Sequence, residues 1–135
     1  MSDAVMIKTI YLKASPEKVW RHQTEIDLLA RWFHETDRDL TAGASFQYLS
    51  FDLDKDDRKL MWGDVLESDP QHRLVHTFTH QWLDGVITKV TWELLAFDGG
   101  TQLTMTHAGF PNFGDFADHD KGWDEHFLRL RSMLS

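Results

Sequence analysis

The feature that most constrains the fold is an alternation of polar and apolar residues with period two, which begins after Gly43. Five segments follow this pattern, and turn-forming sequences such as "SDPQ", "LDG" and "DGG" separate most of them: residues 44–51, 59–68, 73–80, 86–97 and 101–110. Such alternation is typical of strands with one buried face, and short turns between consecutive strands indicate antiparallel pairing. We therefore expect a meander of five antiparallel strands.

An earlier strand and two short helices are predicted before this meander. Residues 6–12, "MIKTIYL", alternate and are rich in β-branched residues, so they favour a strand. Ser15 and Pro16 predict the start of a first helix, because Ser caps well and the N–H that Pro lacks would have no partner within the first turn. Thr24 and Asp27 have the spacing of a capping box, which would open a second helix through "LLARWF".

The chain closes with a predicted amphipathic helix over residues 117–134. Its acidic start and basic end suit the helix dipole. Four apolar residues fall on one helical stripe: Trp123, Phe127, Leu130 and Leu134. Because sheet and helix both need a partner for their apolar faces, the helix should pack across the sheet. The expected fold is α+β, a single domain over residues 1–135 with a curved antiparallel sheet of about six strands.

Composition narrows the classes of function. The 135 residues include 14 Lys and Arg against 22 Asp and Glu, a net charge of −8, and the cations form no cluster. Nucleic acids and anionic membrane surfaces are therefore disfavoured as partners. There is no cysteine, which excludes disulfides and thiolate metal sites. No signal peptide or membrane-spanning apolar run is visible in the sequence, so we expect a cytoplasmic protein.

The order of these elements resembles the START-like, Bet v 1-like helix-grip superfamily (SRPBCC), in the branch named for the activator of Hsp90 ATPase. The resemblance covers nearly the whole chain and is carried by these stretches: "ASPEKVW", "LLARWF", "WGDVLESDPQHRLVHTFTH", "VTWELLAFDGGTQLTMTHAGF" and "KGWDEHFLRL". It implies a helix-grip fold in which the sheet curves around the last helix. A cavity between sheet and helix is then expected.

Histidines in "LVHTFTHQW" raise the question of a metal site. On a helix, His76 and His80 would lie one turn apart and could share a zinc ion. The β-branched and aromatic neighbours favour a strand instead, on which the two residues lie about 13 Å apart. A site that also recruits His107 would need unusual curvature, so we expect no metal. Two interpretations of these imidazoles stay open: hydrogen-bonded core residues, which is the usual state of buried polar groups, or groups that orient a ligand.

Other polar clusters are weaker evidence for a functional site. Four aspartates near His119 and His126 could suggest a metal site, yet they more simply cap and solubilise a helix start: Asp115, Asp118, Asp120 and Asp124. The acidic "DLDKDD" lacks the Gly and the final Glu of a calcium loop, so we interpret it as a solvated turn. Glu67 and Glu93 show no partner in the sequence and are expected to face outward.

The favoured function is non-catalytic binding of a small lipophilic ligand under the last helix. Six Trp and nine Phe supply large rings, which make good walls for apolar ligands. We assign no catalytic residue and no cofactor. The candidate lining residues are aromatic, Met or His side chains expected on the helix-facing side: Trp32, Phe46, Tyr48, Trp62, His76, Phe78, Trp82, Trp92, Met105, His107, Trp123 and Phe127.

Two alternatives come from the resemblance. Some helix-grip proteins are cyclases, aromatases or hydrolases, and His107 or His76 could then act as general acid or base. The family name also implies an interaction protein linked to Hsp90. The sequence starts at its first predicted strand, so we expect no preceding domain, which disfavours Hsp90 activation. A homodimer stays possible.

Overall fold

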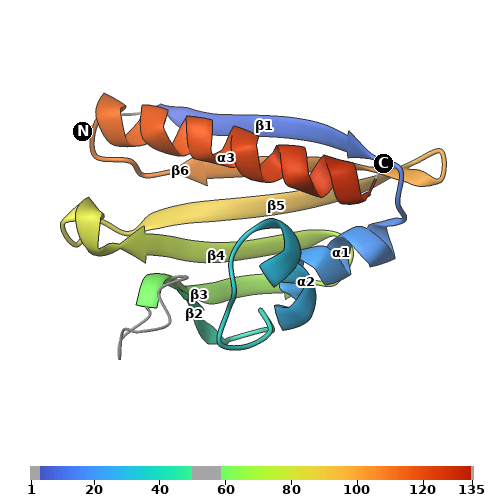
Figure 1. Cartoon of the computed structure of the whole chain (residues 1–135), viewed down its shortest axis with the longest axis horizontal. Coiled ribbons are helices and arrows are strands. Elements are labelled where there is room, and N and C mark those ends of the chain that lie inside the picture. The colour runs from blue at the N-terminus through green and yellow to red at the C-terminus, as the bar shows by residue number, and fades with distance from the viewer. Residues whose placement is uncertain (1–3, 50–58, 135) are drawn as a thin grey trace.

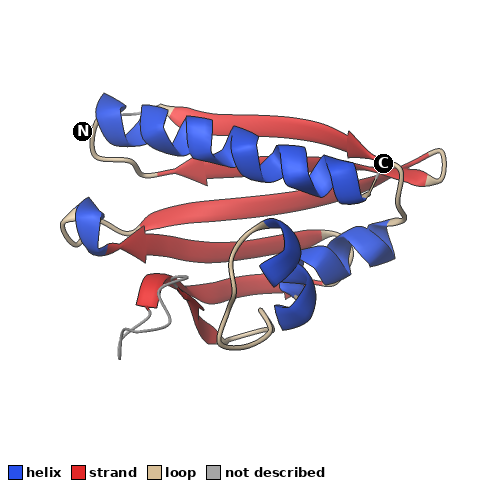
Figure 2. Ribbon diagram, in the orientation of Figure 1, coloured by secondary structure: helices blue, strands red, loops and turns tan. Residues whose placement is uncertain are grey.

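A six-stranded antiparallel sheet carries three helices on one face (Figures 1 and 2). The computed structural model describes residues 4–49 and 59–134. The strands are β1 (Val5–Leu12), β2 (Ser45–Leu49), β3 (Lys59–Asp69), β4 (Arg73–His80), β5 (Thr88–Phe97) and β6 (Gly100–Ala108). The helices are α1 (Pro16–Thr24), α2 (Ile26–Trp32) and α3 (Phe113–Met133), and a short 3-10 helix, η1 (Gln81–Leu83), follows β4. The predicted α+β helix-grip fold is confirmed.

Strands are ordered β1-β6-β5-β4-β3-β2 across the sheet. The five strands after α2 form the predicted meander, and β1 pairs with β6, so both ends of the chain contribute to the same side of the sheet. In Figure 1, α3 runs along β1 and β6, whereas α1 and α2 cover one end of the other half. The helix layer is therefore incomplete over the opposite end of β4. The acidic "DLDKDD" lies outside the described residues.

The first helix begins as predicted, but the second does not. Ser15 Oγ accepts a hydrogen bond from the Lys18 N–H, and Pro16 occupies the first turn of α1. The predicted capping box of Thr24 is wrong, because its hydroxyl donates to the Trp20 carbonyl one turn back in α1. The Ile26 N–H at the start of α2 instead donates to Asp39, which lies 13 positions later in the sequence.

The last helix begins four residues before the predicted start. Asn112 caps it by accepting a hydrogen bond from the Asp115 N–H at 2.8 Å. Most of the predicted stripe is buried within α3, and the last member follows as its C-cap: Trp123, Phe127, Leu130 and Leu134. Lys8 on β1 pairs with Asp120 at 2.8 Å and with Asp124, which ties α3 to the edge of the sheet.

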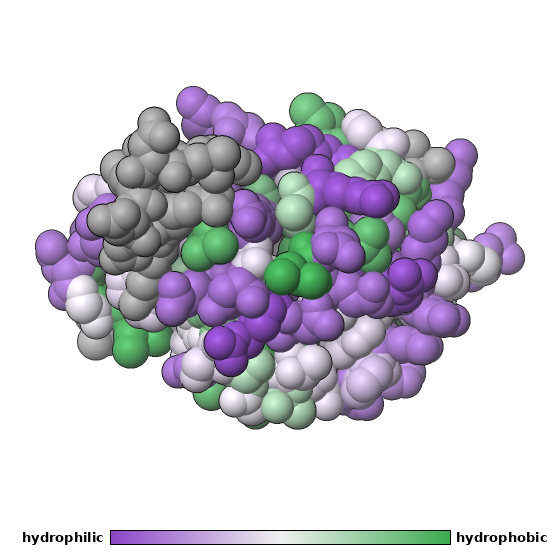
Figure 3. Space-filling view, turned by 60° about the horizontal axis from the view of Figure 1, so that its bottom comes forward, coloured by the Kyte–Doolittle hydropathy of each residue, from purple (hydrophilic) through white to green (hydrophobic). Residues whose placement is uncertain are grey.

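Alternate residues of the strands point into the helix–sheet core. On β6 these are Thr101, Leu103, Met105 and His107, all buried. On the opposite face, Glu67 and Glu93 both bind Arg73, so these carboxylates face outward as predicted but do have a partner. Figure 3 shows mostly hydrophilic residues on one side of the molecule, with hydrophobic patches that are small and separate. Of the helices that the structure describes, none has the length and apolar character to cross a bilayer.

Candidate functional site

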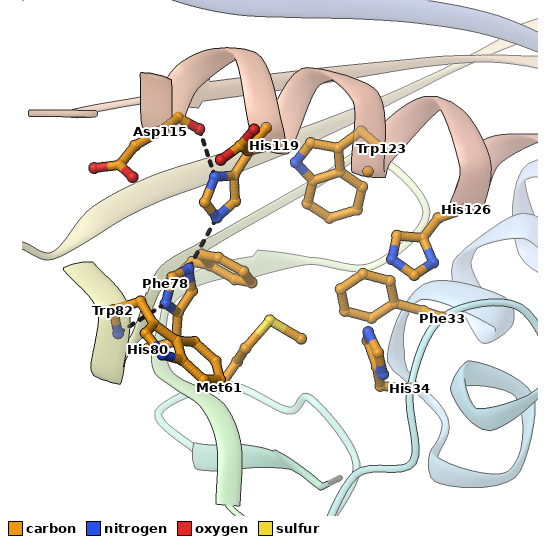
Figure 4. Close-up of a pocket in the computed structure, with 12 residues that line it drawn as sticks. Phe33, His34, Met61, Phe78, His80, Trp82, Asp115, His119, Trp123 and His126 are labelled. Atoms are coloured by element: carbon orange, nitrogen blue, oxygen red, sulfur yellow. Dashed lines mark hydrogen bonds between the residues drawn. The ribbon is translucent and has the colours of Figure 1, made fainter. Parts of the chain in front are cut away.

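A pocket of about 350 Å³ opens where the helix layer is incomplete (Figure 4). Its walls are the first half of α3, the end of β4 with η1, Met61 of β3, and the segment that follows α2. The lining residues are Phe33, His34, Met61, Phe78, His80, Trp82, Asp115, Asp118, His119, Gly122, Trp123 and His126. This volume lies near the lower end of the range for small-molecule sites, roughly 300–1,000 Å³.

Aromatic rings form the deep wall of the pocket. The rings of Phe33 and Trp123 stack with centroids 5.2 Å apart and planes 5° from parallel. Phe78 lies beside Trp123 at 6.4 Å, and both side chains are buried to 96% or more. Trp82 differs, because 64% of its surface is exposed where the pocket meets solvent. The interior is thus apolar and held in place by packing, and the rim carries an exposed aromatic ring.

A hydrogen-bonded pair of histidines closes one end of the pocket. Nε2 of His80 lies 2.9 Å from Nε2 of His119, and the two rings are nearly parallel. The backbone N–H of Trp82 donates to Nδ1 of His80 at 3.3 Å. Nδ1 of His119 lies 2.6 Å from the Asp115 carbonyl, to which it donates. Since an N–H can only donate and a carbonyl can only accept, the proton between the rings belongs to His80.

A second pair of imidazoles lies at the opposite end of the pocket. The rings of His34 and His126 are 5.1 Å apart, and Arg129 donates to Nδ1 of His126. Burial lowers the pKa of His34 to about 4, and Arg129 adds to this shift. Burial also lowers the pKa of His126 to about 4, with His34 and Arg129 contributing. For His80, burial and the neighbouring His119 lower the pKa, and Asp115 opposes them. These three imidazoles are therefore neutral at pH 7.

Gly122 opens the pocket from the middle of α3. Apart from its own helix backbone, no atom of the described residues lies within 4 Å of a Cβ built at this residue, because the space beside it is the pocket. Glycine inside a helix is less favourable than alanine by about 1 kcal/mol. The chain therefore carries an unfavourable residue at a position where any side chain would reduce the cavity.

His76 and His107 are buried beside the pocket, and each is fully hydrogen-bonded. Nε2 of His76 accepts from the Trp92 indole at 2.9 Å, and its Nδ1 donates to the Thr77 carbonyl at 2.8 Å. Burial lowers the pKa of His76 to about 4.

The same arrangement recurs at His107. Its Nδ1 accepts from the Trp123 indole at 3.0 Å, and its Nε2 donates to the Thr88 hydroxyl at 2.7 Å. That hydroxyl in turn donates to the Phe78 carbonyl. Burial lowers the pKa of His107 well below its ordinary value, and His119 adds to this shift. Both nitrogens of each imidazole are thus occupied by partners within the core.

The twelve predicted lining residues divide between this pocket and its surroundings. Three of them line it: Phe78, Trp82 and Trp123. Eight more are buried in the core cluster or against it, and do not line the pocket: Trp32, Phe46, Tyr48, His76, Trp92, Met105, His107 and Phe127. Trp62 borders a separate groove together with Phe46 and Asp64, outside this pocket. Contact of any of the twelve with a ligand stays a prediction.

Sequence reasoning missed much of the polar lining. The sequence leaves open whether His80 is a core residue or orients a ligand, and nothing in it relates His80 to His119, 39 positions away. Phe33 and His34 follow α2, where no periodicity indicates their direction. Gly122 carried a signal, since it interrupts an otherwise periodic helix. Within residues 4–49 and 59–134, no three His, Asp or Glu side chains are grouped so as to hold a metal ion.

Comparisons with known proteins agree with this architecture. The crystal structure of protein MLL2253 from Mesorhizobium loti is 24% identical, with 96% of this chain and 95% of that chain covered and a TM-score of 0.83. The Aha1 dimer from Colwellia psychrerythraea is 20% identical, with coverages of 97% and 96% and a TM-score of 0.78. PFC0360w, an Hsp90 activator from Plasmodium falciparum, is 22% identical, with coverages of 92% and 90% and a TM-score of 0.77. At these identities the likeness shows the fold alone.

A search of curated protein sequences found no match. A family model described as activator of Hsp90 ATPase homolog 1-like protein matches residues 13–135. This range runs from the end of β1 to the end of the sequence and includes all the residues that line the pocket. The chain therefore belongs to the family of activator of Hsp90 ATPase homolog 1-like proteins.

Proposed function

We propose that this protein binds a small lipophilic molecule, without chemical change, in the pocket beneath the first half of α3. The observation that carries the proposal is a concave space of about 350 Å³ walled by Phe33, Phe78 and Trp123. Burial of apolar ligand surface contributes roughly 25 cal/mol per Å². Rings that are already packed lose little conformational freedom when a ligand enters, so this contribution is not offset by ordering of the site.

The polar groups of the pocket support a neutral ligand. His34, His80 and His126 are uncharged at pH 7 because burial lowers their pKa values. The carboxylates that line the pocket, Asp115 and Asp118, disfavour an anion. A few neutral imidazoles at the ends of an apolar space can orient a ligand, and no charged group has to be desolvated when the ligand binds.

Filling the pocket from Gly122 tests this function. The Gly122→Leu substitution should place an isobutyl group in the cavity and reduce the affinity for lipophilic ligands at least tenfold, an order of magnitude expected for the loss of about 1.4 kcal/mol. The thermal unfolding midpoint should stay the same or rise, since leucine is the better helix former. A panel of uncharged lipophiles, followed by Trp fluorescence and thermal shift, measures both quantities.

Lys121→Leu is the matched control, because it adds the same side chain to an exposed neighbouring position of α3 that does not line the pocket. It should leave ligand affinity unchanged. Equal affinities of the wild type and Gly122→Leu for every ligand that binds would contradict the assignment of this pocket. A complete absence of binding to the wild type would contradict the function itself.

Family membership favours a second candidate, an interaction with Hsp90. The Plasmodium neighbour is described as an Hsp90 activator, and the Colwellia neighbour as a dimer. An interaction of this kind should raise the ATPase rate of an Hsp90 from the same organism when the protein is added. Light scattering of the same samples measures whether the protein is a homodimer. An unchanged ATPase rate together with no complex would dispose of this candidate.

A further inference from the structure

The His80–His119 pair has a fixed direction of hydrogen bonding. The Trp82 N–H holds the lone pair of His80 at Nδ1, so His80 Nε2 always donates. The Asp115 carbonyl accepts the proton of His119 Nδ1, so in the His80–His119 bond Nε2 of His119 is the acceptor. At the end of the pocket the two atoms therefore present one donor and one acceptor, 2.9 Å apart.

A hydroxyl group is the ligand chemistry that matches such a pair. Its oxygen can accept from His80 while its hydrogen is donated to His119, so the direct bond is replaced by two and no tautomer changes. A carbonyl or an ether can only accept, which leaves Nε2 of His119 without a donor. An ammonium group can only donate and would leave the proton of His80 unpaired. Unpaired buried polar groups are unfavourable, so these alternatives bind less tightly.

Charges around the pair favour a neutral hydroxyl over an anion. Asp115 and Asp118 line the pocket on the α3 side, and none of the Lys or Arg residues that the structure describes lines it. On the sheet side, the ring of His107 lies 6.0 Å from that of His119, and both nitrogens of His107 are occupied within the core. Among the residues that the structure describes, a carboxylate ligand at this end would meet two carboxylates and no cation.

We propose that the ligand is a planar aromatic compound with a phenolic hydroxyl, and that the hydroxyl inserts between His80 and His119. This inference rests on the proposed binding function and specifies the chemistry of the same pocket. The aromatic body would lie against Phe78 and Trp123, next to the pair, since Phe78 is 6.0 Å from both imidazole rings. Aromatic rings at such separations attract one another, and this attraction adds to the free energy gained by burying their apolar surface.

Insertion requires the two rings to separate. An oxygen that bonds both Nε2 atoms holds them about 4.5 Å apart, given two hydrogen bonds of about 2.8 Å. His80 is only half-buried, and it precedes Trp82, whose side chain is largely exposed. Movement of the His80 ring toward solvent by about 1.5 Å therefore disturbs little packing.

Three naphthalenes that differ only in one substituent test the proposal: 2-naphthol, 2-methoxynaphthalene and naphthalene. Isothermal titration calorimetry should give wild-type protein about tenfold higher affinity for 2-naphthol than for 2-methoxynaphthalene, the size expected for one additional hydrogen bond plus one avoided unpaired group. In His119→Phe the ratio should fall to about one, because the acceptor is absent, while naphthalene still binds. His119→Leu removes the same acceptor, should have the same effect, and replaces the first variant if that one fails to fold.

The matched control is His72→Phe, which makes the same change at an exposed residue in the turn between β3 and β4. It should keep the tenfold ratio. Wild-type affinities that are equal for 2-naphthol and 2-methoxynaphthalene would overturn the hydroxyl assignment and leave lipophile binding intact. A tenfold ratio that persists in His119→Phe, or in His119→Leu where the first variant does not fold, would overturn the role of the pair. No binding of any of the three compounds would overturn both this inference and the proposed function.

Discussion

Acidification from pH 7 to pH 5 is expected to destabilise the protein by several kcal/mol. In the folded state burial lowers the pKa of His76 to about 4, whereas in the unfolded chain it lies near 6.5. Below pH 6.5 the unfolded chain therefore binds protons that the folded protein excludes. The stabilisation is complete above pH 6.5 and is lost as the pH falls toward 4. For His76 alone the loss at pH 5 is about 2 kcal/mol, from about 1.4 kcal/mol for each pH unit.

Other histidines act in the same direction, because burial also lowers the pKa values of His34, His107 and His126. Urea unfolding followed by Trp fluorescence between pH 7.5 and 5 measures the effect above the range where most carboxylates titrate. The double variant His76→Leu/Trp92→Phe removes the imidazole together with its indole donor, so its stability should depend less steeply on pH. A free energy of unfolding that stays constant between pH 7.5 and 5 would contradict the burial of neutral imidazoles.

Replacing Gly63 by alanine is expected to destabilise the protein by about 3 kcal/mol, the upper part of the range for overpacking. The added Cβ would lie 2.0 Å from the Thr77 carbonyl oxygen on β4 and 3.1 Å from the Phe46 ring. The obstruction is backbone of the adjacent strand, so no side-chain rotation can relieve it. The midpoint of urea unfolding measures the change, with the slope used to check two-state behaviour.

Gly122→Ala is the matched control for this substitution. It makes the same change at a position where, in the described part of the chain, no atom outside the helix's own backbone lies within 4 Å of the new Cβ. Stability should stay the same or rise by up to about 1 kcal/mol, because alanine is the better helix former. If Gly63→Ala lowered the free energy of unfolding no more than Gly122→Ala does, this result would contradict the close approach of β3 and β4 at Gly63.

The strand meander could be predicted because its signal is local. One face of each strand is buried, so polar and apolar residues alternate, and β4 occupies the predicted residues 73–80. Helix starts were harder to predict. Thr24 has the spacing of a cap but bonds back to Trp20, and the true partner of the Ile26 N–H is Asp39 in a later loop. Contacts of this kind depend on how the chain folds back, which no local pattern encodes.

In the candidate site, too, local sequence patterns predict some features, and contacts between distant segments determine the others. The direction of Phe78 and Trp123 follows from strand and helix periodicity, and both line the pocket. The meeting of His80 with His119 depends on the angle at which α3 crosses the sheet, so no spacing in the sequence predicts it. His76 and His107 were expected on the helix-facing side of the sheet and lie there, but the indole hydrogen bonds that occupy them come from Trp92 and Trp123 on other elements. Pairings of side chains across a core require coordinates.

Native mass spectrometry of protein purified from its own host tests the binding function most directly. The wild type should retain a small molecule as a non-covalent adduct, and Gly122→Leu, purified in the same way, should lack it because its side chain occupies the pocket. A wild type that carries no adduct and takes none up from a lipophilic extract of the host would contradict the account. An adduct retained equally by both proteins would place the ligand elsewhere.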